Sequence, residues 1–296
     1  MEIAASNEKI NFSIKILNGG EITTKDLALS CTFGRAYNNS DQILRCANYG
    51  KITGVTNIGT LTYTGGIVGQ LRCSVEKCGN FGTVSSANCN VGGIAGYSDA
   101  NEKADSNTTG YSQITDSLNR AAVKTTNSND NRAVGGIVGY AKYVAMNNCY
   151  NTGSVSGNKK GYTGRLIGRF YKSIYNNIDN SYFISGANSV VIDGTKQDVS
   201  KDSSTNSYVK VTKKTSKTMK KKAFATLLNK VSPGTFKYVK KSYPQLKWVT
   251  ALKELKVKYI GAYKGTVKVF YGGSVQLPKP PAGYTYRFNK KKAKGA

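Results

Sequence analysis

The sequence predicts an all-β fold, a parallel β-helix or β-solenoid built from short repeats, and three observations lead to this prediction. Two short signatures recur together along the chain, and copies of the second start 32 to 39 residues apart. The segments between them are rich in Gly, Val, Ile, Thr and Asn without helical spacing of apolar residues, which is typical of strands joined by tight turns. A unit of this length cannot bury an apolar face alone, so neighbouring units must stack.

The first signature is Gly-Gly-aliphatic-aliphatic-Gly, present in three full copies and one worn copy. The copies begin at Gly65, Gly92, Gly135 and Gly164. We expect the third residue of each copy to fill one wall of the interior, which gives the ladder Ile67, Ile94, Ile137 and Leu166.

The second signature starts at a Cys or Ser and has Asn two residues later, Gly or Ala four later and an aliphatic residue six later. Its copies start at Cys46, Cys78, Ser117 and Cys149, with a degenerate fifth at Ser181. The aliphatic positions predict a second ladder, formed by Ile52, Val84, Val123 and Val155. The Asn positions predict a stacked corner rather than a ligand site, formed by Asn48, Asn80, Asn119 and Asn151. A Gly or Asn that recurs at one phase indicates positive φ or close backbone approach.

Together the two signatures resemble the GLUG repeat of bacterial surface and secreted proteins, over about residues 30–186. The resemblance implies a β-solenoid outside the cell, in an adhesin-like chain. It implies no activity, because no catalytic residues accompany this repeat and a fold alone does not determine a function.

We expect four regions along the chain. Residues 1–29 form an N-terminal strand or cap, and residues 30–189 form the GLUG-type solenoid. Residues 190–250 form a basic cap over the second end of the solenoid, and residues 251–296 form a partial small β module with a basic tail. The alternating residues of this last region are similar to a small β repeat of internalin-type and other cell-wall proteins.

The basic cap contains one amphipathic segment. Residues 219–229 place Ala223, Phe224, Leu227 and Leu228 at helical spacing, behind Thr218 as a possible N-cap. We expect Trp248, which follows in a Tyr-Pro-x-Leu-x-Trp sequence, to supply buried area rather than to stack on a sugar.

Charge divides the chain into two parts. The protein has 43 Lys and Arg against 16 Asp and Glu, a net charge of +27. Residues 190–296 hold 25 of these basic residues and 4 of the acidic ones, so the second part is strongly basic. Such a part favours polyanionic partners.

The predicted polyanion-binding residues are the lysines of three basic runs, Lys220, Lys221, Lys222, Lys240, Lys241, Lys290, Lys291 and Lys292. The expected partner is an anionic cell-wall polymer or glycan, and a host surface protein is a further partner class. Nucleic acid is not favoured, because no groove-reading element or stacking platform is recognisable. No apolar run reaches the length of a membrane span, and the N-terminus lacks the features of a signal peptide, so we expect the leader of a secreted protein to lie outside this chain.

The prediction is therefore a non-enzymatic adhesion or scaffold protein at a bacterial surface, with no catalytic, cofactor or metal site. The chain has no His, which excludes catalytic triads that need one, and Cys73 and Cys78 lack a second cysteine pair for zinc. Two alternatives stay open. One is a β-helix polysaccharide lyase that uses Arg72, Lys142 or Lys172 as a base beside clustered carboxylates, and the other is a polyanion-binding module whose rod is only a spacer.

Cysteine usage does not determine the compartment. Cys46 and Cys78 fall in adjacent repeats, near enough for a disulfide. The replacement of Cys by Ser at the same phase favours a ladder of small buried side chains instead.

Overall fold

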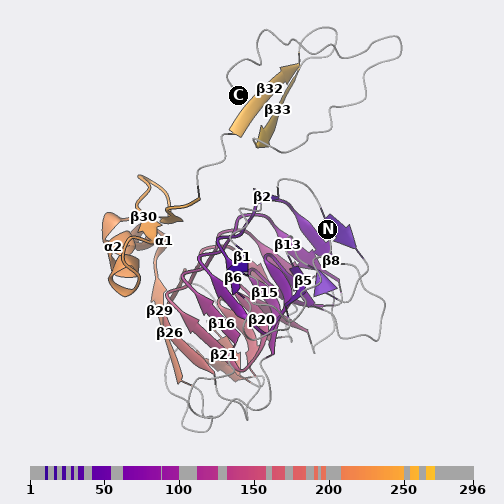
Figure 1. The fold of residues 1–296 in the computed structure, drawn as a ribbon, viewed down its shortest axis with the longest axis vertical. Helices are drawn as coiled ribbons and strands as arrows, with labels where there is room; N and C mark the ends of the chain where they lie inside the picture. The colour runs from indigo at the N-terminus through magenta and orange to yellow at the C-terminus, as the bar shows by residue number, and fades with distance from the viewer. Residues whose placement is uncertain are drawn as a thin grey trace.

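The computed structural model describes the repeats and the segment that follows them. The described residues are 11–12, 17–18, 22–24, 28–29, 33–36, 42–54, 63–87, 89–99, 112–125, 132–157, 162–170, 176–184, 190–192, 195–197, 208–249, 254–259 and 265–270. Within them the chain forms a parallel β-solenoid, which confirms the predicted fold class (Figure 1). No described helix is long and apolar enough to cross a membrane.

Each coil of the solenoid contributes five short strands, and the strands of successive coils pair in parallel to form five walls. Wall 1 contains β1 (Asn11–Phe12), β6 (Gln42–Leu44), β11 (Ser74–Glu76), β16 (Ser112–Thr115) and β21 (Val144–Asn147). Wall 2 contains β2 (Leu17–Asn18), β7 (Ala47–Asn48), β12 (Gly79–Asn80), β17 (Leu118–Asn119) and β22 (Tyr150–Asn151). Strand β26 (Asn177–Ile184) continues both walls and joins them into one sheet.

The other three walls are separate sheets. Wall 3 contains β3 (Ile22–Thr24), β8 (Ile52–Gly54), β13 (Val84–Ser86), β18 (Val123–Thr125) and β23 (Val155–Ser156). Wall 4 contains β4 (Ala28–Leu29), β9 (Tyr63–Gly65), β14 (Asn90–Gly92), β19 (Ala133–Gly135) and β24 (Tyr162–Gly164). Wall 5 contains β5 (Phe33–Ala36), β10 (Val68–Leu71), β15 (Ala95–Asp99), β20 (Val138–Lys142), β25 (Ile167–Phe170) and β27 (Val190–Ile192).

The first coil begins earlier than the sequence suggested. We expected residues 1–29 to form a cap, but β1 to β4 lie inside this range and pair in parallel with β6, β7, β8 and β9. The solenoid therefore contains strands from Asn11 onward. This coil was missed because the first signature is absent here and the second, which continues as Asn18, Gly20 and Ile22, begins at Ile16 instead of a Cys or Ser.

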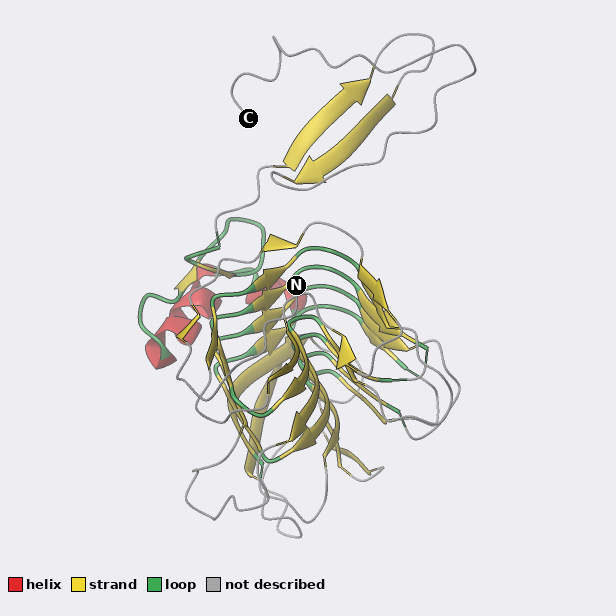
Figure 2. Cartoon of the chain, turned by 45° about the vertical axis from the view of Figure 1, so that its right-hand side comes forward, coloured by secondary structure: helices red, strands yellow, loops and turns green. Residues whose placement is uncertain are grey.

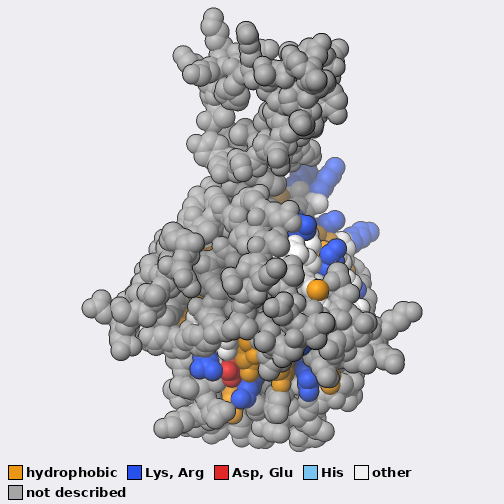
Figure 3. Space-filling view, turned by 90° about the vertical axis from the view of Figure 1, so that its right-hand side faces the viewer, with side chains coloured by type: hydrophobic (Ala, Val, Ile, Leu, Met, Phe, Trp, Pro, Cys, Tyr) orange, Lys and Arg blue, Asp and Glu red, His pale blue; other side chains and the backbone are white. Residues whose placement is uncertain are grey.

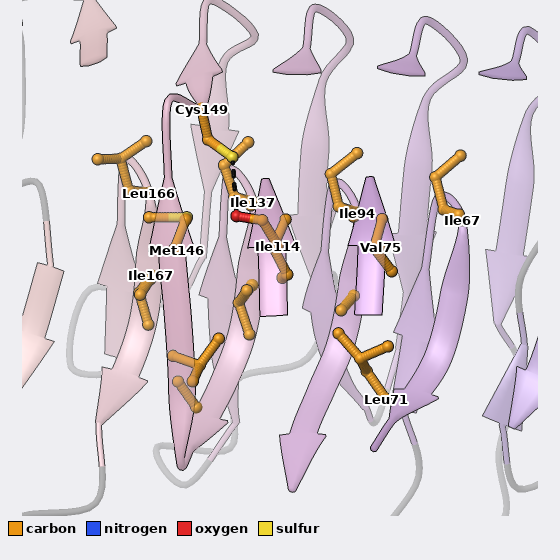
Figure 4. Close-up of a cluster of buried hydrophobic side chains, with 14 of the residues drawn as sticks. Ile67, Leu71, Val75, Ile94, Ile114, Ile137, Met146, Cys149, Leu166 and Ile167 are labelled. Atoms are coloured by element: carbon orange, nitrogen blue, oxygen red, sulfur yellow. Dashed lines mark hydrogen bonds between the residues drawn. The ribbon is translucent and has the colours of Figure 1, made fainter. Parts of the chain in front are cut away.

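Two apolar ladders fill the interior, as predicted. Ile67, Ile94, Ile137 and Leu166 are fully buried between walls 1 and 5, where they face Val75, Ile114 and Met146 (Figure 4). The second ladder packs between walls 3 and 4 and contains Ile52, Val84 and Val123, with Val155 partly buried beside them. The cross-section thus has two apolar cores.

The Asn residues form a hydrogen-bonded ladder between these cores, which confirms the predicted corner. Asn48 Nδ2 donates to Asn80 Oδ1 at 2.7 Å, Asn80 to Asn119 at 2.7 Å and Asn119 to Asn151 at 2.8 Å. Gly93, from the other signature, lies against Asn119, and a Cβ at this glycine would overlap the Asn119 side chain and the Gly136 carbonyl. The two signatures therefore recur together because residues of one pack against residues of the other.

The Cys and Ser column is a second polar ladder. The Cys46 N–H donates to Cys78 Sγ at 3.3 Å, and the Cys78 N–H donates to Ser117 Oγ at 3.1 Å. The Cys78 thiol donates in turn to the carbonyl groups of Ile43 and Glu76, so Cys46 and Cys78 are linked by a backbone-to-sulfur hydrogen bond and not by a disulfide. Burial raises the pKa of Cys149, the last cysteine of the column, so this thiol stays protonated.

After the last coil the chain adds one strand to each of two existing sheets, and then two helices, a two-stranded sheet and a hairpin. Strand β28 (Thr195–Gln197) is antiparallel to β27, and β29 (Tyr208–Lys214) runs parallel to β26. Helix α1 (Ser216–Met219), helix α2 (Lys222–Val231), β30 (Phe236–Lys237) and β31 (Gln245–Leu246) follow. The hairpin of β32 (Glu254–Tyr259) and β33 (Gly265–Phe270) is drawn apart from the coils (Figures 1 and 2).

Candidate polyanion-binding surface

Residues 215–249, here called the lateral segment, pack against the outer face of wall 2. In the second signature, the residue after the initial Cys or Ser points outward, so wall 2 presents the column Ala47, Gly79, Leu118, Tyr150 and Tyr182. Helix α2 buries Phe224 and Leu228 against this column. The Phe224 ring lies 5.7 Å from the Tyr150 ring and 5.2 Å from the Tyr182 ring, both edge to face.

Hydrogen bonds fix the lateral segment along the coils. Trp248 Nε1 donates to the Lys77 carbonyl at 2.8 Å, Asn148 Nδ2 donates to the Leu228 carbonyl at 3.0 Å, and the Tyr150 hydroxyl donates to the Pro244 carbonyl. We expected this part of the chain to cover the second end of the solenoid, and it lies along the side instead (Figure 2). The structural role expected for Trp248 is confirmed.

The helix also differs from its predicted bounds. We expected one helix over 219–229 capped by Thr218, but α1 begins at Ser216 and Thr215 Oγ1 accepts from the Thr218 N–H at 3.1 Å. Helix α2 starts after Lys221, whose side chain makes no capping hydrogen bond. The bounds of such short helices depend on tertiary packing, here that of Phe224 and Leu228. Helix propensity in the sequence does not contain this information.

Two of the three predicted basic runs belong to the lateral segment, and one lysine of the first run lies against Tyr243. The Lys220 Nζ lies 5.0 Å from the centre of the Tyr243 ring, and the Tyr243 hydroxyl lies 2.8 Å from Ser216 Oγ. The exposed Lys240 and Lys241 lie in a turn closed by the Ser242 N–H and the Val239 carbonyl at 3.0 Å, and Tyr243 follows this turn. Lys221 and Lys222 are exposed beside Lys220. The third run, Lys290 to Lys292, lies outside the described residues.

The charge on this surface is uncompensated within the described structure. The lateral segment holds nine lysines and no Asp or Glu. Ion pairs of the described residues lie elsewhere, between Arg72 or Lys142 and Asp99 and between Lys77 and Glu76. Figure 3 shows the side of the molecule that lies away from α2 in Figure 1, where Lys and Arg side chains of described residues are also visible.

Sequence reasoning missed one cation of this surface, Arg120. It follows Asn119 on wall 2, at the position where other coils carry Tyr49 and Phe81, whose rings stack at 4.7 Å. The Arg120 Cζ lies 5.9 Å from the Phe81 ring centre and 5.5 Å from that of Tyr243. The available signal was a basic residue that follows two aromatic residues at the same position of successive repeats.

The residues considered for lyase chemistry are also placed. Arg72 Nη2 contacts Asp99 Oδ2 at 2.9 Å, and Lys142 Nζ lies 3.9 Å from Asp99 Oδ1. Both cations therefore share a single carboxylate, and Lys172 lies outside the described residues. A cavity of about 510 Å³ on wall 1 includes one carboxylate, Asp179, in its lining. No group of three or more potential metal ligands occurs in the part of the chain that the structure describes.

Comparison with known proteins adds no relative. No protein-family model matches the chain, and neither a curated protein nor a solved structure matches it. The resemblance to GLUG repeats therefore stays a prediction based on the two signatures.

Proposed function

We propose that this protein is a non-enzymatic scaffold that binds anionic polymers at a bacterial surface through its lateral segment. The observation that supports the proposal most directly is that the lateral segment, which has no acidic residues, carries two lysine runs and that Lys220 of the first lies against Tyr243, two residues after the second. The runs are Lys220 to Lys222 and Lys240 to Lys241. Exposed cations that lack carboxylate partners raise the local concentration of a polyanion and accelerate its capture.

The solenoid supports this role mechanically. Successive coils are joined by backbone pairing within each wall and by the buried Asn and Cys/Ser ladders. The lateral segment therefore packs on a rigid body. In this proposal the segment retains the protein on a wall polymer or glycan, and the coils present their loops to a further partner, such as a host surface protein. The GLUG resemblance favours this location and an adhesin-like role.

Retention on an immobilised teichoic acid across a salt series tests the proposal. Replacement of the five lysines by Gln should weaken binding at least about tenfold at low salt and flatten its salt dependence, because fewer counterions are released. The matched comparison is Lys240→Gln with Lys241→Gln against Lys51→Gln with Lys124→Gln, since Lys51 and Lys124 are exposed on the solenoid and the charge loss is equal.

Equal effects of the two pairs would show that only net charge matters and would contradict a defined surface. Unchanged retention of the five-lysine variant would refute the proposal itself. Binding of the wild-type protein that salt does not release would refute its electrostatic basis.

A further inference from the structure

Tyr243 lies between two cations that come from different parts of the chain. Arg120 belongs to wall 2, and its Cζ lies 5.5 Å from the Tyr243 ring centre, while Lys220 Nζ from the end of α1 lies 5.0 Å from it. Arg120 Nη2 also donates to Ser242 Oγ at 3.0 Å. This is the place where the lateral segment crosses the solenoid.

Each of the two charges lies against the Tyr243 ring without a carboxylate to balance it. Neither Arg120 nor Lys220 forms an ion pair with a described acidic residue. Both side chains are half-buried, unlike the exposed Lys221, Lys222 and Lys241 nearby. Partial removal from water strengthens the interaction of such cations with an anion, because solvent screening is weaker there.

The donors at this place match an oxyanion. The hydrogen bond to Ser242 uses one of the five N–H donors of the Arg120 guanidinium, so further donors remain in a rigid, planar fork. This fork binds phosphate and carboxylate oxygens in pairs, whereas the ammonium of Lys220 acts as a point charge. Ser242 Oγ contacts Arg120 directly, and the Ser216 and Tyr243 hydroxyl groups lie 2.8 Å from each other.

We propose that Arg120, together with Lys220 and Ser242, forms a discrete site for one phosphate group of a phosphodiester polymer. The inference rests on the proposed function and adds a preference to it: the exposed lysines attract polyanions in general, and the Arg120 site selects phosphate. A phosphodiester group has two non-bridging oxygens that share its negative charge and project from a tetrahedral phosphorus. A guanidinium fork can therefore bind both oxygens while an ammonium approaches from outside their plane, an approach that a planar carboxylate suits less well.

The test compares two polymers with two arginine variants. Binding of the full chain is measured on poly(glycerol phosphate) and on polygalacturonate, at equal charge concentration and equal salt. Arg120→Lys keeps the charge but removes the fork, so it should lower affinity for the phosphate polymer about five- to tenfold and leave affinity for polygalacturonate within about twofold. The matched control is Arg45→Lys, on an exposed arginine of the solenoid, and it should change neither.

A second variant and a spectroscopic probe make the outcome decisive. Lys220→Gln should also lower phosphate-polymer affinity more than polygalacturonate affinity. Trp248 is the single tryptophan of the chain and bonds to Lys77, so its emission reports whether the lateral segment stays docked. Equal losses on both polymers, a changed Trp248 emission in Arg120→Lys, or no loss at all would each overturn the phosphate site. Failure of the five-lysine variant to lose binding would instead overturn the broader proposal.

Discussion

Asn119 occupies the centre of the buried amide ladder and is the residue whose loss should cost most there. Its Nδ2 donates to Asn151 Oδ1, and its Oδ1 accepts from Asn80 Nδ2. Asn119→Ala leaves two buried groups without these partners, at about 1–3 kcal/mol each, so we expect a loss of roughly 2–6 kcal/mol in the free energy of unfolding. Urea denaturation measures this, with Gln113→Ala as an exposed control on the same coil. A loss below about 0.5 kcal/mol would show that the ladder contributes nothing.

Arg45 illustrates a residue-scale feature that the sequence could not reveal. The corners between walls 1 and 2 have positive φ, and the residues there are Arg45, Lys77, Asp116, Asn148 and Asn180. These residues share no type, so composition carried no signal, and the recurring glycines serve close backbone approach instead. The Asn ladder, by contrast, was predictable because a buried amide column tolerates only one kind of side chain.

The left-handed corner at Arg45 predicts a stabilising substitution. Arg45 has φ of 55°, a conformation that glycine adopts without steric cost, so Arg45→Gly should stabilise the fold by about 1 kcal/mol despite the added freedom of the unfolded chain. Lys124→Gly, in strand β18, is the opposite case and should destabilise it by about 0.5–1 kcal/mol. Thermal denaturation measures both variants. If Arg45→Gly and Lys124→Gly lower the melting temperature by similar amounts, the backbone at Arg45 is not strained.

At the scale of elements, the start of α2 combines an absent cap with unfavourable charge. Lys221 is the N-cap without a side-chain hydrogen bond, and no acidic residue lies in the first turn. Lys221→Asp should stabilise the fold by about 1 kcal/mol, because a carboxylate caps the free N–H groups and favours the positive helix end. The same change should weaken retention on teichoic acid.

Lys230→Asp is the charge-matched control for this prediction. Lys230 lies in the last turn of α2, where a carboxylate is unfavourable, so the substitution should destabilise the helix. Thermal unfolding and polymer retention of both variants separate the two effects. If Lys221→Asp binds the polymer as well as the wild type, the lysines at this helix start have no part in binding.

At this scale, what could be predicted from the sequence depends on whether the residues in contact share a repeating pattern. Strand phases could be predicted because each strand repeats the pattern of its neighbour about 32 residues away. The docking of α2 depends on Phe224 meeting Tyr150 and Tyr182, and no local pattern connects these residues. The lysine runs could be identified from the sequence because each is continuous. The contact of Arg120 with Tyr243 could not, because the two residues are far apart in the chain.

For the whole molecule, the described ionisations place the response to pH in the alkaline range. Burial raises the pKa values of Tyr97, Tyr150 and Tyr182, and it raises that of Tyr49 to about 12, against an opposing effect of Arg120. A raised pKa means that the folded state favours the neutral phenol. The contribution of each buried phenol to the free energy of unfolding is therefore fully present below about pH 10, the pKa of tyrosine in the unfolded chain. It is lost as the pH rises through the pKa of that tyrosine in the folded state.

We thus expect the urea midpoint to fall steeply between pH 10 and pH 12. Tyr49→Phe keeps the ring that stacks on Phe81 but removes one ionisation, so its midpoint should fall less over this interval. The chain has no His, so the side chain that ordinarily titrates between pH 5 and 8 is missing. A midpoint that does not change between pH 9 and pH 12 would contradict the burial of these phenols.

The lateral segment also constrains how many coils this protein can have. It is anchored at one place by Phe224 against Tyr150 and Tyr182 and at another by Trp248 on the carbonyl of Lys77, three coils away from Tyr182. A tandem duplication of one repeat between these anchors would move them about 4.8 Å further apart, the spacing of neighbouring strands. Repeat arrays ordinarily gain and lose units with little penalty, but here such a change would detach one anchor. The distance between the two anchors thus fixes the number of coils between them. We therefore expect the number of repeats to be more restricted between Lys77 and Tyr182 than before Lys77.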